Sequence, residues 1–264
     1  MAIAPGSPRT LERMKLKMNT AVSLYPPIAD YAFLGNCQST ALVSRDGSID
    51  WCCFRRFDSP PCFGRLLDWR KGGYFGVTIS GAPRATRSYV QRTNILETRV
   101  RTASGVLTVT DFLPIAAGDD SSSPRPRSQL IRLVRCERGE VDAQIDFEPR
   151  FDFGVTTPRT DLTSDSLGVV YGGADALVVQ CELGLRQTSH SGCSARGILR
   201  PGEEVAAIVT HALPHQLRPR SLSAATIRER LGETRRFWQD WSGRCTYQGR
   251  YQEQGSAAQS FSRR

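Results

Sequence analysis

The sequence predicts a mainly β protein: an antiparallel β-sandwich (super-sandwich) with a linker helix at its C-terminal end. Between residues 73 and 212, runs of about five to ten residues with strand character alternate with Gly, Pro, Ser and Asp. No amphipathic segment long enough for a crossover helix interrupts these runs, and a parallel sheet needs such helices. Only beyond residue 221 does the apolar spacing change from that of strands to that of a helix.

The first predicted hairpin lies between residues 40 and 54. The apolar run Thr40–Val43 leads into a turn at Asp46-Gly47, a pair that supplies the positive φ angles of a tight connection. The second strand, Ile49–Phe54, is followed by Pro60-Pro61, which lacks the backbone donors of a β-ladder. We therefore expect the chain to leave the sheet here.

Glycines mark two further predicted hairpins. Glu140–Glu148 alternates apolar with acidic or amide side chains, so one face is buried and the other solvated. We expect it to pair with Leu130–Cys136 across Arg138-Gly139, and Ile95–Thr102 to pair with Val106–Leu113 across a similar turn. Shorter strands are predicted at Gly168–Tyr171, Ala176–Glu182 and Glu203–Thr210.

The segment after residue 221 predicts one amphipathic helix. Ser221 or Ser223 can cap its start, and Gly243 can end it. Two interpretations are open: a terminal helix packed on the sandwich, or a linker helix whose tryptophans contact a partner. One face carries apolar residues and a threonine at helical spacing, namely Ile227, Leu231, Thr234, Trp238 and Trp241.

Specific motifs are dense around the first hairpin and recur in order along the chain. The first three are Gly47-Ser-Ile-Asp-Trp51, Phe57-Asp-Ser-Pro60 and Phe63-Gly-Arg-Leu-Leu-Asp68. Over residues 25 to 251 the chain resembles the opening domain of family 15 glycoside hydrolases, the bacterial glucoamylase and trehalase-like enzymes. The later motifs are Asn94-Ile-Leu-Glu-Thr98, Thr110-Asp-Phe-Leu-Pro114, Glu148-Pro-Arg-Phe-Asp152 and Phe237-Trp-Gln-Asp-Trp241.

This resemblance implies a non-catalytic role. The resembled enzymes hydrolyse an α-glucosidic bond with inversion, using two glutamates of an (α/α)₆ barrel. Inverting carboxyl groups stand about 6.5–9.5 Å apart, and no position of this sequence matches either glutamate. We therefore expect a scaffold for a barrel normally joined in cis, with the α-glucoside substrate reaching the chain only through that barrel. No catalytic residue and no cofactor is predicted.

Two alternative functions are open. One is a free-standing carbohydrate-binding or protein-interaction sandwich. The other is an enzyme assembled in trans with a separately encoded barrel.

Seven residues are candidates for a domain interface or a substrate wall. An acid beside an aromatic ring, as at Asp50, can face a sugar or a second domain, and a Pro-broken segment suits docking. The competing interpretations are that the aromatic residues belong to the core and that Asp58 serves an Asx-type turn. The candidates are Asp50, Trp51, Arg55, Phe57, Asp58, Trp238 and Trp241.

The predicted organisation has four parts. Residues 1–24 form a disordered or mis-started arm, 25–220 the β-sandwich and 221–243 the linker helix. Residues 244–264 read as a truncated tail without the catalytic barrel. Within the sandwich, residues 118–127 are rich in Ser, Pro, Gly and Asp and predict a flexible surface loop.

The charge pattern argues against nucleic acid as a partner. The net charge is +9, but residues 1–20 contribute +3 and residues 250–264 contribute +2 of it. No basic stripe interleaved with aromatic residues is present. The N-terminal segment also lacks an apolar stretch long enough for secretion or membrane insertion, so we expect a cytoplasmic protein with no membrane partner.

The cysteine and histidine pattern predicts no metal site. None of the eight cysteines forms a Cys-x-x-Cys pair, and we expect them to be reduced and to act as small hydrophobes. The metal-like spacings are His190 with Cys193 and His211 with His215. Pro214 interrupts the second pair, so it is not a ligand pair on an undistorted helix.

Overall fold

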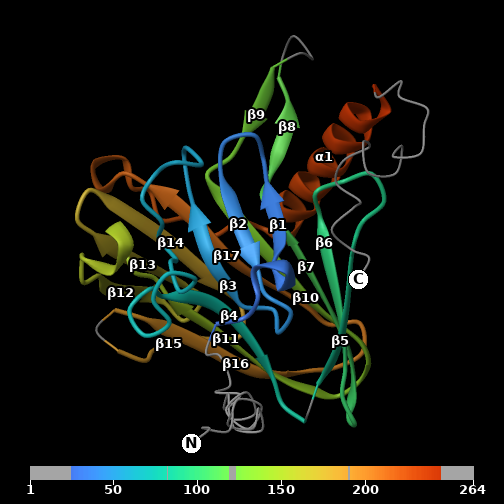
Figure 1. Ribbon diagram of the computed structural model, residues 1–264. Coiled ribbons are helices and arrows are strands. Elements are labelled where there is room, and N and C mark those ends of the chain that lie inside the picture. The colour runs from blue at the N-terminus through green and yellow to red at the C-terminus, as the bar shows by residue number, and fades with distance from the viewer. Residues whose placement is uncertain (1–24, 82, 119–122, 190, 245–264) are drawn as a thin grey trace, which may run out of the picture.

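The structure of the protein, a computed structural model, describes residues 25–81, 83–118, 123–189 and 191–244. Two antiparallel sheets form a β-sandwich, and helix α1 (Ala224–Gly243) lies beside it (Figure 1). This confirms the predicted fold class. The predicted N-terminal arm lies outside the described residues, as does the predicted tail after Arg244.

The first sheet has seven strands and contains the predicted β2–β3 hairpin, which is confirmed. In its turn Gly47 has a φ of 84°, whereas the Asp46 side chain accepts a hydrogen bond from the Ser44 hydroxyl. The spatial order is β1 (Ala32–Gly35), β2 (Thr40–Val43), β3 (Ile49–Cys53), β4 (Tyr74–Ile79), β11 (Val141–Glu148), β16 (Cys193–Leu199) and β15 (Leu185–Gln187).

The second sheet has eight strands and contains the predicted β6–β7 hairpin, with Leu96 opposite Asp111. The three shorter predicted strands are also present, as β13, β14 and β17. The spatial order is β12 (Arg159–Ser164), β13 (Leu167–Gly172), β14 (Asp175–Cys181), β17 (Glu204–Ala212), β10 (Gln129–Gly139), β7 (Gly105–Phe112), β6 (Leu96–Arg101) and β5 (Arg84–Tyr89).

The predicted hairpin between residues 130–136 and 140–148 is wrong. β10 pairs with β7 and β17, whereas β11 pairs with β4 and β16, so these consecutive strands lie in opposite sheets. Gly139, with a φ of 73°, and Glu140 carry the chain from one sheet to the other. The burial patterns agree with this, because β10 is buried on both faces over Gln129–Val134 whereas β11 alternates between buried and half-buried residues.

A two-stranded ribbon projects beside α1, as Figure 1 shows. It consists of β8 (Ile115–Ala117) and β9 (Pro124–Pro126). The predicted flexible loop at 118–127 is therefore corrected in part, because three of its residues form a strand. The ribbon is tied to the helix by the Ile115 backbone N–H, which donates to the Thr234 hydroxyl at 3.1 Å. Short 3₁₀ turns occur at Ile28–Asp30, Asp152–Gly154 and Pro214–Gln216.

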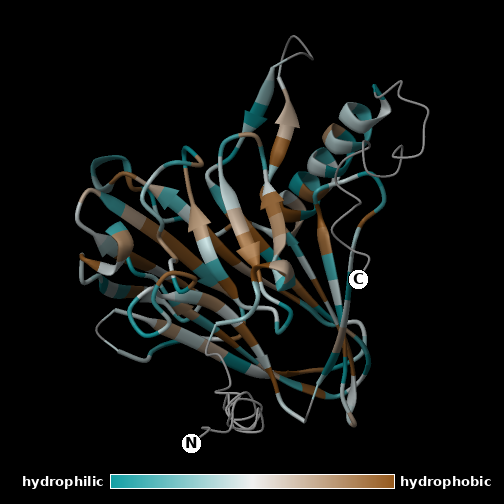
Figure 2. Ribbon diagram, in the orientation of Figure 1, coloured by the Kyte–Doolittle hydropathy of each residue, from teal (hydrophilic) through white to brown (hydrophobic). Residues whose placement is uncertain are grey.

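Two apolar clusters hold the fold together. The larger one fills the space between the sheets and includes Phe75 and Phe147, whose rings stack with centroids 4.7 Å apart. The smaller one joins the second sheet to the helix through Ile227, with Leu231 packed against it. Figure 2 shows hydrophobic residues concentrated on the strands and a largely hydrophilic helix. The first half of α1 thus packs on the sandwich, as one of the two open interpretations predicts.

The start of α1 is fixed by local hydrogen bonds. The Ser223 hydroxyl accepts from the Thr226 backbone N–H at 3.2 Å, which is an N-cap. Just before the cap, the Gln180 side chain accepts from the Leu222 N–H at 2.7 Å and donates to its carbonyl at 3.0 Å. These bonds anchor the helix to β14.

Arg132 links the two sheets from within the core. Its side chain has no exposed surface and makes two hydrogen bonds to the Asp111 carboxylate, at 2.7 and 3.1 Å. A third bond, of 3.1 Å, goes from Arg132 to the Phe75 carbonyl on β4. Arg132 and Asp111 belong to the second sheet and Phe75 to the first, so the ion pair joins two strands of the second sheet and the bond to the Phe75 carbonyl links the two sheets.

The seven cysteines in the described residues are all free thiols, and all but Cys37 are buried. Burial raises the pKa of Cys181 to about 11 and that of Cys193 to about 12, so both thiols are neutral at physiological pH. This agrees with the prediction of reduced, hydrophobe-like cysteines.

Replacing one partner of the buried ion pair is expected to destabilise the fold strongly. Asp111→Ala leaves the Arg132 charge buried and unpaired, which lowers the free energy of unfolding by about 3–5 kcal/mol. Urea denaturation measures this. The control is Asp161→Ala, which breaks the exposed pair with Arg159 and costs less than about 1 kcal/mol. Equal losses in the two variants would show that the buried pair of Arg132 and Asp111 contributes no more to stability than an exposed one.

Candidate functional site

An aromatic cleft of about 440 Å³ opens beside the C-terminal half of α1. Four segments form its walls: β1 with its turn into β2, the loop after β3, the end of β5 with the turn into β6, and the last turns of α1. Every large apolar side chain that lines it in the described chain is aromatic: Phe33, Phe57, Tyr89, Trp238 and Trp241.

Asn36 builds the wall between β1 and β2. Its side-chain oxygen accepts from the Ser39 N–H at 2.8 Å, which closes an Asx-type turn. Its amide nitrogen donates to the carbonyls of Pro114 and Arg127, at 3.0 and 2.9 Å. Because Asn36 is fully buried, these bonds fix the turn in one position.

Asn94 and Tyr89 join this wall to the second sheet. The Asn94 side chain accepts from the Gly35 N–H at 2.5 Å and donates to the Phe33 carbonyl at 3.3 Å. The Tyr89 hydroxyl donates to the same carbonyl at 2.8 Å. The backbone of Phe33 is therefore held firmly while 44% of the residue surface stays exposed at the cleft.

The two helix tryptophans are held edge to face. The Trp238 and Trp241 ring centroids lie 5.8 Å apart with an interplanar angle of 84°. The helix end is fixed to the β5–β6 turn, because the Arg92 side chain donates to the Ser242 hydroxyl and to the Gln239 carbonyl, both at 3.2 Å. Trp241 is 47% exposed. The second half of α1 thus presents aromatic surface that this part of the chain leaves uncovered.

The cleft brings together three of the seven predicted residues, Phe57, Trp238 and Trp241, although they lie far apart in the sequence. Phe57 is 72% exposed. Arg55 and Asp58 are exposed on the same loop but do not line the cleft.

The exposed acid of this loop, Asp58, is already paired. Asp58 accepts two hydrogen bonds of 2.8 Å from Arg56, and this guanidinium lowers the pKa of the Asp58 carboxyl. Trp51 is half-buried on β3, away from the cleft lining.

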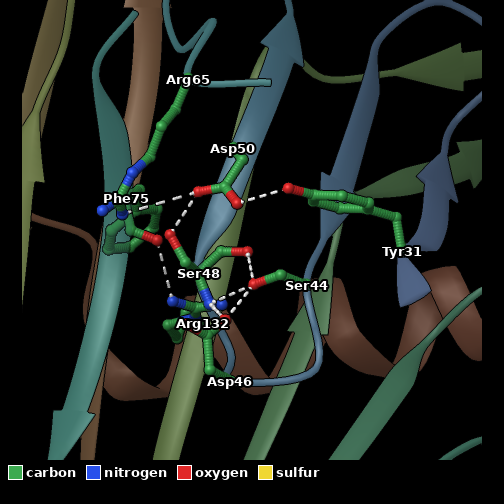
Figure 3. Close-up of polar contacts among 8 residues, drawn as sticks. All are labelled: Tyr31, Ser44, Asp46, Ser48, Asp50, Arg65, Phe75 and Arg132. Carbon is green, nitrogen blue, oxygen red and sulfur yellow. Dashed lines mark hydrogen bonds and ion pairs between the residues drawn. The ribbon is translucent and has the colours of Figure 1, made fainter. Parts of the chain in front are cut away.

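Asp50 lies inside the domain and has no exposed surface (Figure 3). Its carboxylate accepts from the Tyr31 hydroxyl at 2.8 Å and from the Ser48 hydroxyl at 2.5 Å, and an Arg65 nitrogen lies 3.9 Å away. It therefore presents nothing to a sugar or to a second domain. Burial, followed by the hydrogen bond to Asp50, raises the pKa of Tyr31.

Arg65 connects this network to the segment that follows β3. Its guanidinium carbon lies 3.9 Å from the ring centroid of Trp69 and 4.2 Å from that of Tyr74. The Leu66 backbone N–H donates to the Asp50 carbonyl at 3.0 Å. Asp50 thus holds the segment at Arg65 and Leu66 against the first hairpin.

The sequence prediction missed Phe33, Ser39, Tyr89 and Asn94 as cleft residues. Two signals were present: Asn94 begins one of the quoted motifs, and the polar run from Asn36 to Ser39 separates two short apolar runs. Phe33 and Tyr89 carried no such signal, because an aromatic residue within a strand predicts a core position equally well.

The fold and the cleft define a β-sandwich domain with a C-terminal helix and an open aromatic surface. The sequence model of a family described as "Trehalase-like, N-terminal" matches residues 20–209, and the chain belongs to this family. This confirms the predicted resemblance to the N-terminal domain of trehalase-like glycoside hydrolases.

Three curated relatives are trehalases. The chain is 37% identical over 168 residues to that of Mycolicibacterium smegmatis, covering 58% of this chain and 24% of the relative. It is 29% identical to that of Thermoplasma volcanium, covering 86% and 36%, and 28% identical to that of Mycobacterium tuberculosis, covering 82% and 34%. The chain thus spans between about a quarter and about a third of these relatives.

The described residues contain no group of three or more His, Cys, Asp or Glu side chains placed to hold a metal ion. No described helix combines the length and the apolar character needed to cross a membrane.

Alkaline pH is expected to weaken the contribution of Tyr31 to stability. The folded state raises the pKa of Tyr31 above its ordinary value of 10.0, so the contribution is complete below pH 10 and is lost as the pH rises further. The difference in unfolding free energy between the wild type and Tyr31→Phe should therefore be larger at about pH 8 than at about pH 11. Urea denaturation at both values measures it.

Ser48→Ala is the matched control, because it removes the second hydroxyl bond to Asp50 without removing a titrating group. Its difference from the wild type should be nearly the same at the two pH values. A Tyr31→Phe difference that stays constant would contradict the role assigned to the Tyr31 hydroxyl.

Proposed function

We propose that this chain is the non-catalytic N-terminal domain of a cytoplasmic α-glucoside hydrolase of family 15, of the trehalase or glucoamylase type, and that the catalytic barrel docks on its aromatic cleft. The observation that carries the proposal is the convergence of Phe57, Trp238 and Trp241 on one open surface. Exposed contiguous aromatic surface marks an interaction site more often than a solvated face.

The exposure of the rings supports docking. Phe33, Phe57 and Trp241 are 44%, 72% and 47% exposed, although each is large enough to contribute substantially to a core. Aromatic residues of this kind dominate the energetics of protein interfaces. The hydrogen bonds of Asn36, Asn94 and Arg92 fix the backbone next to Phe33 and Trp241, so less conformational entropy is lost there on docking.

The chemistry of the cleft supports a non-catalytic role. Glycoside hydrolysis by acid and base needs two carboxyl groups astride the bond, and the described lining of the cleft contains no Asp, Glu or His. The two acids among the predicted candidates are engaged elsewhere: Asp50 is buried and Asp58 is paired with Arg56. The catalytic glutamates then belong to the barrel.

The comparisons support the placement of a second domain. Each of the three trehalases is about three to four times as long as the part that this chain covers, since that share is 24–36% of each relative. The helix that carries Trp238 and Trp241 ends at Gly243 beside the cleft, so the chain leaves the described domain next to the proposed docking surface.

Removing the exposed rings is expected to weaken docking without unfolding the domain. The 264-residue chain is mixed with the part of the M. smegmatis trehalase outside the matched region, and association and glucose release from trehalose are measured. Phe57→Ala with Trp241→Ala should reduce the association constant about 30-fold, because each deletes a central interface ring. Stability should change by less than about 0.5 kcal/mol, because both rings are largely exposed.

Phe153→Ala is the matched control, because Phe153 is 56% exposed but does not line the cleft. It should leave association unchanged. An unaltered association constant in the Phe57 and Trp241 double variant would overturn the docking proposal, and glucose release by the chain alone would overturn the non-catalytic role.

A further inference from the structure

A second cavity, of about 330 Å³, lies between the two sheets. One wall of this inter-sheet cavity comes from β4 and the β2–β3 turn of the first sheet. The other comes from β5, β6 and β7 of the second sheet. The described linings of the inter-sheet cavity and the aromatic cleft share no residue. The inter-sheet cavity is therefore independent of the surface proposed for docking.

The inter-sheet cavity lies where the first sheet is incomplete. In the described chain, β3 pairs with β4 through Ile49 and Phe75 alone. β4 continues to Ile79, whereas the neighbouring hairpin turns back at Asp46 and Gly47. The last residues of β4 therefore have a turn instead of a paired strand beside them, and the space between the sheets is open there.

The walls of the inter-sheet cavity are aliphatic and belong to the core. Val77 and Val109 are members of the larger apolar cluster, and they are 6% and 4% exposed. Val100 is also only 6% exposed, yet in the described chain it joins neither apolar cluster. Protein interiors are normally close-packed, so a space of this size among core side chains indicates a site for a ligand.

One hydroxyl group is accessible from this space. Thr98 lies between Leu96 and Val100 on the face of β6 that points to the core, and it is 4% exposed. Its side chain has no hydrogen-bond partner in the described chain, but its oxygen is not completely buried, unlike the unpaired oxygen of Thr160. Because Thr98 lines the inter-sheet cavity, a ligand seated there reaches this oxygen. A threonine hydroxyl both donates and accepts, so it suits a hydroxyl group on the ligand.

The charges at the rim cancel. Arg45 and Asp46 are the charged residues of the described lining. Arg45 is paired with Asp30, and Asp46 accepts a hydrogen bond from the Ser44 hydroxyl. A charged ligand would lose water there without gaining a counter-charge of its own. The described lining also contains no aromatic ring, which favours a flexible aliphatic chain over a flat ring.

We propose that the inter-sheet cavity binds a neutral aliphatic alcohol. The chain of the alcohol lies against Val77, Val100 and Val109, and its hydroxyl group bonds the Thr98 hydroxyl. A volume of about 330 Å³ is near the lower end of the range for small-ligand sites, so the chain is short. This inference goes beyond the proposed function, because the inter-sheet cavity uses none of the residues assigned to docking.

The test is a calorimetric titration of the 264-residue chain with 1-octanol and with 1-hexanol. We expect saturable binding of 1-octanol, with a dissociation constant of about 0.1–1 mM. 1-Hexanol should bind about 15-fold more weakly, because each methylene group removed from water changes the affinity about fourfold. Octanoate replaces the hydroxyl end by a carboxylate, and it should bind at least about tenfold more weakly than 1-octanol.

Two variants test the assigned residues. Thr98→Val keeps the shape of the side chain without the hydroxyl, so it should weaken 1-octanol binding about fivefold. Thr86→Val is the matched control, because it makes the same change on β5 outside the described lining, and it should bind as the wild type does. Ala85→Phe places a ring at the rim and should abolish binding. Ala85 is exposed, so urea denaturation should show a folded domain of nearly unchanged stability.

The inference is overturned if 1-octanol shows no saturable binding, or if 1-hexanol binds as tightly as 1-octanol. It is also overturned if Thr98→Val and Ala85→Phe both bind as the wild type does. Octanoate binding as tight as that of 1-octanol would overturn the assignment to a neutral ligand. All three variants leave the aromatic cleft unchanged, so a failure of docking overturns the proposed function alone.

Discussion

A guanidinium group with no access to water is stable in a core only when its N–H groups have hydrogen-bond acceptors. Arg132 has acceptors in both sheets. Its bonds to Asp111 and to the Phe75 carbonyl set the position of β10 over β4. The first hairpin follows from this, because Ile49 on β3 pairs with Phe75. Asp50, one residue further along, then receives Tyr31 from the start of the sandwich. Figure 3 shows Arg132, Phe75, Asp50 and Tyr31 as neighbours within one region of the core.

The cleft combines buried polar side chains that fix the backbone with aromatic rings that stay exposed. Polar side chains such as Asn36 and Asn94 form hydrogen bonds with backbone groups, which fixes the β1–β2 turn against the second sheet. The aromatic rings are thereby displayed on backbone that has no freedom to collapse onto them. A small sandwich that buried Phe33 and Trp241 would gain stability. Their exposure therefore indicates that the chain keeps this surface for something other than its own folding.

Local signals in the sequence predicted the elements but not their neighbours. The β2–β3 and β6–β7 hairpins and the helix cap at Ser223 were predicted because each rests on residues a few positions apart. The crossing at Gly139 was not predicted, because periodicity shows which residues are buried but not which sheet they join. The cleft itself was not predicted, although three of the seven candidate residues, Phe57, Trp238 and Trp241, line it. Their wall partners and the burial of Asp50 depend on contacts between distant segments, such as Tyr31 with Asp50.

Docking has to be consistent with the unpaired polar atoms next to the cleft. The Ser39 hydroxyl and the Trp238 indole nitrogen are already buried without a hydrogen-bond partner among the described residues, at a cost of about 1–3 kcal/mol each. A partner domain that covers the exposed rings leaves this cost unchanged, because neither atom is accessible before docking. The free energy gained on docking therefore comes from Phe33, Phe57 and Trp241, whose exposed apolar surface a partner domain removes from water.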